Sequence, residues 1–282
     1  MKFKILGSGG MYPTPLINCH CKVCESARNG NTKDIRSMPA LYLEEYKLLI
    51  DTPEDIFHTL IKNNIDDIDY LSLSHRDPDH VRGIRVVESF FNWKTEKPKK
   101  TIDFFGLKEV VDDINEWNHD TLDFYHNILK VININTCIEK RIGDLKITML
   151  NNHPRPDLDI ANYVFEKDGT KLIYACCNAK PFKDYDLYKD ADVLIISMVD
   201  ATKIDNPNRE PYEFDDELFS FEEIEEIKNK YNIKRVICTH IDCNWGNTYD
   251  VLHNYELNHD IEFAYDGMEI ELGNKNEKIR RK

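Results

Sequence analysis

Hydrophobic and polar positions divide the chain into short apolar runs and longer segments with helical spacing. The apolar runs are typical of buried strands and lie at 3–6, 40–44, 47–50, 70–74, 101–105, 146–150, 163–166, 171–176, 193–197 and 235–239. The helical segments lie between them, at 53–63, 81–91, 107–117, 121–128 and 220–230. The last of these opens with a capping box, Ser220-Phe221-Glu222-Glu223. This alternation predicts an α/β sandwich.

The order of these elements predicts a single domain. Two βαβ-like halves follow one another without an internal repeat or a low-complexity linker. We therefore expect one domain over 1–272 and a basic, disordered tail over 273–282. The segment 207–219 is rich in proline and acidic residues, which predicts a loop at the border of the active site.

Composition indicates a globular protein of the cytoplasm. Hydrophobic residues make up 41% of the 282 residues, which is enough for a core. The longest apolar runs, such as 193–196, are too short to span a bilayer, and no apolar segment follows a basic N-terminus. In that compartment, the eight cysteines are expected to be thiols or metal ligands rather than disulfides.

The net charge of −14 argues against extensive binding of nucleic acid, because phosphate backbones require a basic face. A small phosphodiester substrate stays compatible with this charge, since divalent cations would dominate the field inside a cleft. No membrane partner is expected, and the sequence leaves a homodimer open.

The segment 73–80, LSHRDPDH, carries the chemistry. It places two imidazoles and two carboxylates within six residues, directly after a strand-like run: His75, Asp77, Asp79 and His80. A tight loop at the end of a strand can aim alternate side chains at one point, as a divalent metal site requires. The alternative is a solvated polar loop, and further candidates elsewhere weigh against it: Asp51, His153 and His240.

The spacing resembles the H-x-H-x-D-H signature of the metallo-β-lactamase superfamily, with Asp77 in the place of the second histidine. An apolar run ending in Asp51 and a glycine, Gly83, three residues after His80 are similar to that family as well. The resemblance implies a four-layer αβ/βα sandwich with a binuclear hydrolytic site at one edge.

A cysteine cluster narrows the resemblance. The segment 19–24, CHCKVC, the glycine turn 6–10 and the closing segment 265–270 resemble the PhnP-like phosphodiesterase subgroup. In that subgroup three such cysteines and a distant histidine hold a structural zinc. In this sequence Cys243 stands in the place of the histidine. The resemblance therefore implies one structural zinc with four cysteine ligands: Cys19, Cys21, Cys24 and Cys243.

The same resemblance implies the other metal ligands. The first site would hold His75, Asp77 and His153, and the second Asp79, His80, Cys177 and His240. Strand register places Cys177 in phase with Ile173 and Ala175, opposite the family's bridging aspartate. The alternatives are a capped surface histidine at His153 and a buried, inert thiol at Cys177.

The two altered positions have opposite consequences for the metal. A carboxylate at Asp77 favours harder ions such as Mn²⁺ or Fe²⁺, whereas a thiolate at Cys177 favours Zn²⁺. We therefore expect one or two catalytic divalent metals, drawn from Zn²⁺, Mn²⁺ and Fe²⁺. Asp200 stands where the subgroup has a histidine that assists the leaving group, and its alternative role is a loop or helix cap.

These residues predict a metal-dependent hydrolase. Its expected substrate is a small phosphodiester, either cyclic or linear. A metal-bound hydroxide would be the nucleophile, with Asp79 orienting the water, His240 holding the metal and Asp200 as candidate acid. Two alternatives stay open. One is a non-catalytic or accessory protein of the same fold, and the other is a lactone or thioester hydrolase.

Overall fold

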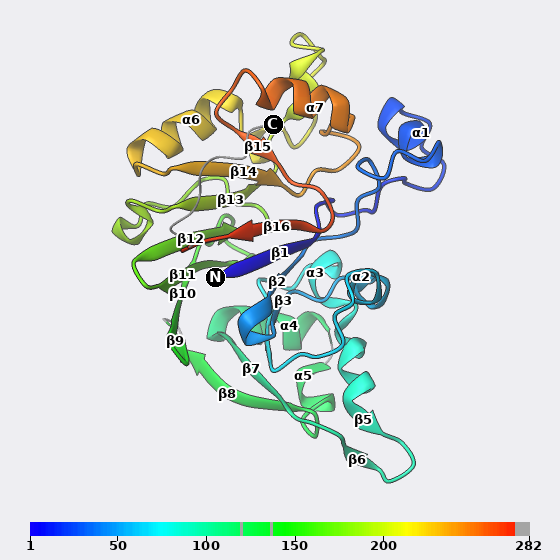
Figure 1. Cartoon of the computed structure of the whole chain (residues 1–282), viewed down its shortest axis with the longest axis vertical. Coiled ribbons are helices and arrows are strands. Elements are labelled where there is room, and N and C mark those ends of the chain that lie inside the picture. Colours follow the sequence, from blue (N-terminus) through cyan, green and yellow to red (C-terminus); the bar gives the residue numbers. More distant parts are fainter. Residues whose placement is uncertain (119–120, 136–137, 274–282) are drawn as a thin grey trace.

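Two mixed β-sheets form the centre of the protein. The computed structural model describes residues 1–118, 121–135 and 138–273 (Figure 1). Within these residues the first sheet has the strand order β16-β1-β2-β3-β4-β7-β8: β1 (Lys2–Gly7), β2 (Ala40–Leu43), β3 (Leu48–Ile50), β4 (Tyr70–Ser72), β7 (Ile102–Leu107), β8 (Leu129–Asn135) and β16 (Met268–Glu271). The second has the order β15-β14-β13-β12-β11-β10-β9: β9 (Ile138–Ile142), β10 (Leu145–Asn151), β11 (Ala161–Lys167), β12 (Thr170–Ala175), β13 (Val193–Ser197), β14 (Arg235–Thr239) and β15 (Glu262–Phe263).

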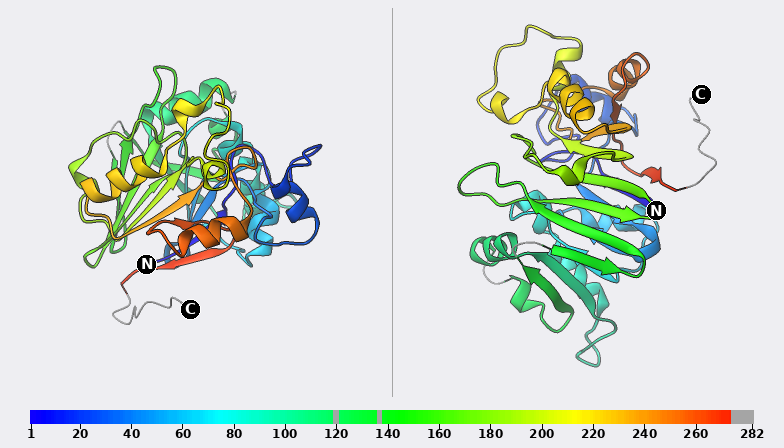
Figure 2. Two further views of the ribbon diagram at one scale, coloured as in Figure 1. Left: turned by 90° about the horizontal axis from the view of Figure 1, so that it is seen from above. Right: turned by 90° about the vertical axis from the view of Figure 1, so that its left-hand side faces the viewer.

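Helices cover the outer sides of the two sheets. The green strands of the second sheet lie over the blue and cyan strands of the first in the right-hand view of Figure 2. The helices are α1 (Lys22–Arg28), α2 (Ile56–Lys62), α3 (Pro78–Val81), α4 (Lys108–Trp117), α5 (Thr121–Phe124), α6 (Phe221–Lys230) and α7 (Tyr249–Glu256). Helices α6 and α7 flank the second sheet, and α2 to α5 flank the first (Figure 1). The predicted α/β sandwich is confirmed. A small hairpin of β5 (Phe91–Asn92) and β6 (Lys97–Pro98) projects at the bottom of Figure 1.

The central strand β13 shows why its apolar run is continuous. Val193 and Ile195 pack into the core that joins the two sheets, whereas Leu194 and Ile196 pack into a second core with residues of α6 and α7. Successive side chains of a strand point to opposite faces, so a strand covered on both faces must be apolar at every position.

The predicted helix over 81–91 is wrong in type and extent. Helix α3 ends at Val81, and a 3₁₀ helix (Ile84–Phe90) follows after Gly83. Gly83 donates its backbone N–H to the carbonyl of Thr52 at 2.7 Å, and a Cβ at this position would lie 1.9 Å from the carbonyl oxygen of Pro53. This close backbone approach requires glycine and interrupts the helical pattern.

Of two other predicted helices, one is shorter than expected and one begins as expected. The helix expected over 121–128 ends at Phe124. The predicted capping box of α6 is confirmed, because Ser220 Oγ accepts from the N–H of Glu223 and the Glu223 carboxylate accepts from the N–H of Ser220.

The single domain over 1–272 stays a prediction. Apart from Gly273, the predicted tail lies outside the described residues. In the described part of the chain, no helix has the length and apolar character that crossing a bilayer requires.

Candidate metal centres

The candidate ligands come from strand ends that meet at one edge of the sandwich. Asp51 follows β3, His75 lies three residues after β4, and His240 follows β14. Strands β3 and β4 are parallel neighbours, so Asp51 and the segment with His75 lie at the same edge of the first sheet, and β14 of the second sheet brings His240 to them. Three groups have ligand atoms within 4.8 Å of one another: His75, His80 and Cys177; Asp79, His80 and His240; and Asp51, His80 and Cys176.

Several imidazole nitrogens in these groups have no hydrogen-bond partner. The buried Nε2 atoms of His75, His80 and His240 are without one. The Nε2 atoms of His80 and His240 each lie 3.4 Å from Asp79 Oδ2. A buried polar atom without a partner is costly, and a shared cation would remove that cost. Imidazole, carboxylate and thiolate are also the ligands that Zn²⁺ and related ions prefer, so these residues fit a divalent metal.

Asp51 fixes the orientation of His80. Its Oδ2 lies 2.8 Å from His80 Nδ1, and Ser74 donates its N–H and hydroxyl to the same carboxylate at 2.6 and 2.8 Å. A carboxylate on Nδ1 directs Nε2 toward a metal and makes the imidazole a better ligand. The sequence indicated Asp51 as a candidate but did not indicate that it contacts His80. It gave no indication of Ser74 or Cys176. The parallel pairing of β3 with β4 was the signal that would have placed Asp51 beside the motif.

The charges of the centre support one another. Burial raises the pKa of the Cys177 thiol, but the His240 and His75 imidazoles beside it lower that pKa well below its usual value. Burial and His80 lower the pKa of His75, while Cys177 and Asp77 bring it to about 9. Burial likewise lowers the pKa of His240, and Cys177 and Asp79 raise it to about 10. The two imidazoles therefore favour the thiolate form of Cys177, which is the form that binds a metal.

The register argument for Cys177 is wrong, although the residue reaches the centre. Strand β12 ends at Ala175, so the alternation does not continue. Ile173 and Ala175 pack with the core under α6 and α7, whereas Cys177 packs with the core between the sheets. Its thiol is grouped with His75 and His80 and also interacts with His240, which places it between the two predicted sites.

Asp77 and His153 do not join these groups. The Asp77 carboxylate lies 3.3 Å from His75 Nε2, and its side chain is 34% exposed. His153 has a half-exposed side chain, and its Nδ1 lies 2.8 Å from Asp159 Oδ1. Asp159 orients His153 as Asp51 orients His80, and nothing in the sequence pattern pointed to it. Their roles as ligands stay predictions.

Asp200 lies outside these groups as well. Its buried carboxylate accepts two hydrogen bonds from the Arg209 guanidinium, at 2.6 and 3.0 Å, and one from the Thr202 hydroxyl. The carboxylate thus faces a guanidinium and a hydroxyl of its own loop. The arrangement fits the alternative role, in which Asp200 organises the loop that starts at β13.

The four predicted cysteines come together at a second place. The sulfur atoms of Cys19, Cys21, Cys24 and Cys243 lie within 4.8 Å of one another. Those of Cys19 and Cys243 are 3.9 Å apart. A disulfide would need about 2.05 Å, whereas tetrahedral zinc with bonds of about 2.3 Å separates its sulfurs by about 3.8 Å. Four thiols at this spacing fit a structural zinc.

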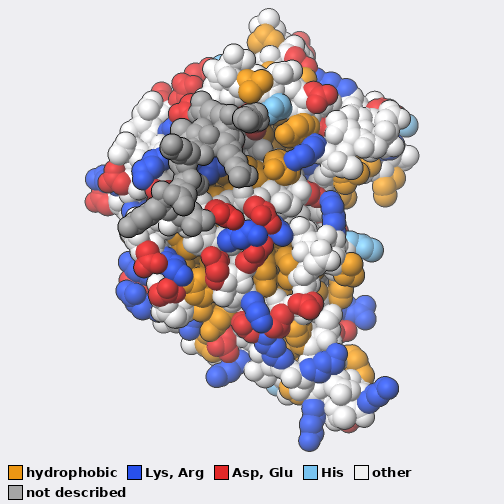
Figure 3. All heavy atoms as spheres, in the orientation of Figure 1, with side chains coloured by type: hydrophobic (Ala, Val, Ile, Leu, Met, Phe, Trp, Pro, Cys, Tyr) orange, Lys and Arg blue, Asp and Glu red, His pale blue; other side chains and the backbone are white. Residues whose placement is uncertain are grey.

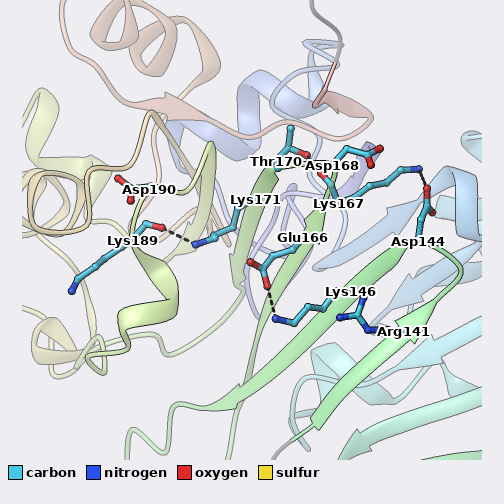
Figure 4. A pocket seen from close by; sticks show the side chains of 11 residues that line it. Arg141, Asp144, Lys146, Glu166, Lys167, Asp168, Thr170, Lys171, Lys189 and Asp190 are labelled. Atoms are coloured by element: carbon cyan, nitrogen blue, oxygen red, sulfur yellow. Dashed lines mark hydrogen bonds and ion pairs between the residues drawn. The ribbon is translucent and has the colours of Figure 1, made fainter.

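One surface hollow is lined by charged side chains, several of which are already paired. Figure 3 shows acidic and basic side chains interspersed over one face. A hollow of about 430 Å³ lies near the start of β10 and β12 (Figure 4), and none of the candidate ligands lines it. Its lysines already have partners: Lys146 pairs with Glu166 at 3.0 Å, and Lys171 donates to two backbone carbonyls.

Comparison with solved structures identifies the fold. The crystal structure of a diphosphatase from the PhnP family has a TM-score of 0.73 at 19% identity, over 96% of this chain and 98% of that one. The zinc-bound PqqB from Methylobacterium extorquens has a TM-score of 0.71 at 18% identity, over 96% of this chain and 100% of that one.

Comparison of sequences identifies the family. The chain is 31% identical over 119 residues to an octanoyltransferase from Porphyromonas gingivalis, a match that covers 42% of this chain and 23% of that protein. The chain thus spans only about a quarter of that relative. The model of the beta-lactamase superfamily domain matches residues 46–241, well over half of the chain. This chain belongs to the beta-lactamase superfamily.

Proposed function

We propose that this superfamily hydrolase is a metal-dependent phosphodiesterase that acts on small phosphodiesters. One observation carries the proposal. Buried imidazole nitrogens without hydrogen-bond partners converge with the Asp79 carboxylate and the Cys177 sulfur at one place. A packed core has no use for such a set of groups, whereas a cation-dependent hydrolytic site requires it.

The proposed ligand sets combine the groups described above with two predicted ligands that lie outside them, Asp77 and His153. Asp79, His80, Cys177 and His240 would hold one cation, and His75 with Asp77 and His153 would hold a second. A bound divalent cation supplies a Lewis acid for a phosphoryl oxygen and lowers the pKa of the water that it binds.

The chain's own residues supply position and proton acceptance. Asp51 holds His80 in one orientation, and Trp245 donates its indole N–H to the carbonyl oxygen of His240 at 3.0 Å. Asp79 lies 3.4 Å from both imidazoles, so its carboxylate stands at the centre of the group. From there Asp79 can accept a hydrogen bond from the attacking water and orient it toward phosphorus.

The substrate class follows from charge and from the fold. A chain of net charge −14 disfavours long polyanions, which supports a small diester. The PhnP-family neighbour is a diphosphatase, so diphosphates belong in the same screen.

The test is turnover by purified protein that has been stripped of metal and reconstituted with Zn²⁺, Mn²⁺ or Fe²⁺. The screen contains cyclic nucleotides, cyclic ribose phosphates, bis(p-nitrophenyl) phosphate and diphosphates. We expect turnover of at least one diester that depends on added metal. If none is turned over with any metal or mixture, the accessory-protein alternative replaces this proposal.

A second candidate is hydrolysis of an acyl ester or thioester. The match to an octanoyltransferase favours it, because that relative transfers an acyl group, although the matched part is 23% of its length. The same metal centre would polarise a carbonyl oxygen in place of a phosphoryl oxygen. A parallel assay with octanoyl thioesters and lactones separates the two candidates.

A further inference from the structure

One nitrogen of His240 has no assigned partner. Its Nε2 faces Asp79 at 3.4 Å, whereas its Nδ1, on the other side of the ring, is buried without a hydrogen-bond partner. An imidazole that binds a cation through Nε2 carries its proton on Nδ1. A buried N–H group without an acceptor is destabilising.

Asp242 carries a matching acceptor. The residue is fully buried. Its Oδ1 accepts from the backbone N–H of Asn244 at 2.9 Å and from the side-chain amide at 2.7 Å. Its Oδ2 is buried and has no partner. One oxygen of the carboxylate therefore holds the turn, and the other makes no hydrogen bond, although the Tyr12 backbone and the Cys243 thiol also lie near this carboxylate.

Both groups lie against the same glycine. A Cβ at Gly10 would lie 2.9 Å from Asp242 Cβ and 3.2 Å from His240 Nδ1. The two side chains thus border one small space that only a glycine leaves open. The Trp245 indole also packs there, 3.1 Å from the same position.

We propose that Asp242 is the positioning residue of His240. When a cation fixes the imidazole through Nε2, Asp242 Oδ2 accepts the hydrogen bond from Nδ1–H. The bond holds the ring toward Asp79, as Asp51 holds His80 at 2.8 Å and Asp159 holds His153 at 2.8 Å. This inference rests on the proposed metal centre.

The test compares the affinity of the active centre for Zn²⁺ in the wild type and in Asp242→Asn, by competition with a chelator. Asparagine keeps the oxygen that accepts from Asn244 and replaces the free oxygen by a donor. We expect a loss of roughly 10–100-fold in affinity, with the four-cysteine site still filled. Asn244→Ala, which removes one of the bonds to Oδ1, is the control and should retain wild-type affinity.

A double variant separates positioning from folding. In a His240→Ala background, Asp242→Asn should add no further loss if it acts through His240. Equal affinity in the wild type and Asp242→Asn, or equal losses in Asn244→Ala and Asp242→Asn, would overturn the inference alone. A wild type that binds zinc only at the four cysteines would overturn the proposed function, and this inference with it.

Discussion

The two candidate metal centres are built in different ways. The four-cysteine site takes its ligands from two loops that are more than 200 residues apart in sequence, around 19–24 and at Cys243. The histidine-rich centre takes its ligands from the short helix α3 and from segments that follow strands such as β4, β12 and β14. The first site has four equal soft ligands, whereas the second mixes imidazole, carboxylate and thiolate. A site of the first kind fastens loops, and a site of the second kind does chemistry.

The largest expected effect concerns the histidine-rich centre. His240→Ala or Asp79→Asn should lower phosphodiester turnover by orders of magnitude, because each removes a ligand of the same cation. The measurement is kcat/KM for bis(p-nitrophenyl) phosphate. His253→Ala is the matched control, since His253 is a half-exposed histidine paired with Glu256. Full activity in His240→Ala would show that turnover does not require this centre.

The second effect concerns stability. Cys21→Ser should remove one metal equivalent and lower the free energy of unfolding by more than about 4 kcal/mol, as loss of a structural metal does. Metal analysis and thermal unfolding measure the two results. Cys238→Ala is the control, because Cys238 is buried in β14 outside every group of candidate ligands. The four-cysteine zinc site is refuted if both variants keep the same metal content.

The third effect tests the place where the two regions meet. Gly10→Ala puts a methyl group 2.9 Å from Asp242 Cβ and 3.2 Å from His240 Nδ1. Overpacking of this kind costs about 1–3 kcal/mol, and here it should also weaken metal binding at the histidine-rich centre. Chemical denaturation with metal analysis checks both. An unchanged centre would mean that the N-terminal turn does not constrain His240.

Much of this arrangement could be predicted from the sequence, and the failures have physical causes. The apolar runs located most of the interior strands because their burial on both faces leaves no polar position, as in β13. Short edge strands such as β15 and β16 carry too little pattern to be found. The prediction of a helix over 81–91 was wrong because the backbone of Gly83 packs closely against the Pro53 carbonyl. Pro53 is 30 residues earlier in the chain, so no local pattern contains this contact.

The residues of the candidate site likewise divide into those that the sequence could predict and those that it could not. The motif 75–80 and the cysteines 19–24 could be found because they are local in sequence. Asp51 could also be found, but its contact with His80 could not, because 29 residues separate them, and no pattern pointed to Asp159. Cys177 does lie beside His75 and His80, but the register argument for it fails because β12 ends before it.

The smallest effect concerns Asp77. Asp77→Ala should weaken one metal position about tenfold, or about 1.4 kcal/mol, because the partly exposed carboxylate lies at the edge of the group near His75. The four-cysteine site should stay filled. Metal stoichiometry measured against Asp157→Ala, an exposed aspartate, provides the comparison. Unchanged stoichiometry and affinity would remove Asp77 from the ligand set.

The central claim is that this chain holds metal at two separate places, one structural and one catalytic. A crystal structure of the metal-reconstituted protein with anomalous difference maps, recorded at the absorption edge of each metal, tests it most directly. The account predicts one zinc peak among the sulfurs of Cys19, Cys21, Cys24 and Cys243. It also predicts at least one peak among His75, Asp79, His80, Cys177 and His240. Pairwise disulfides without a peak at the first place, or no peak at the second, would contradict it.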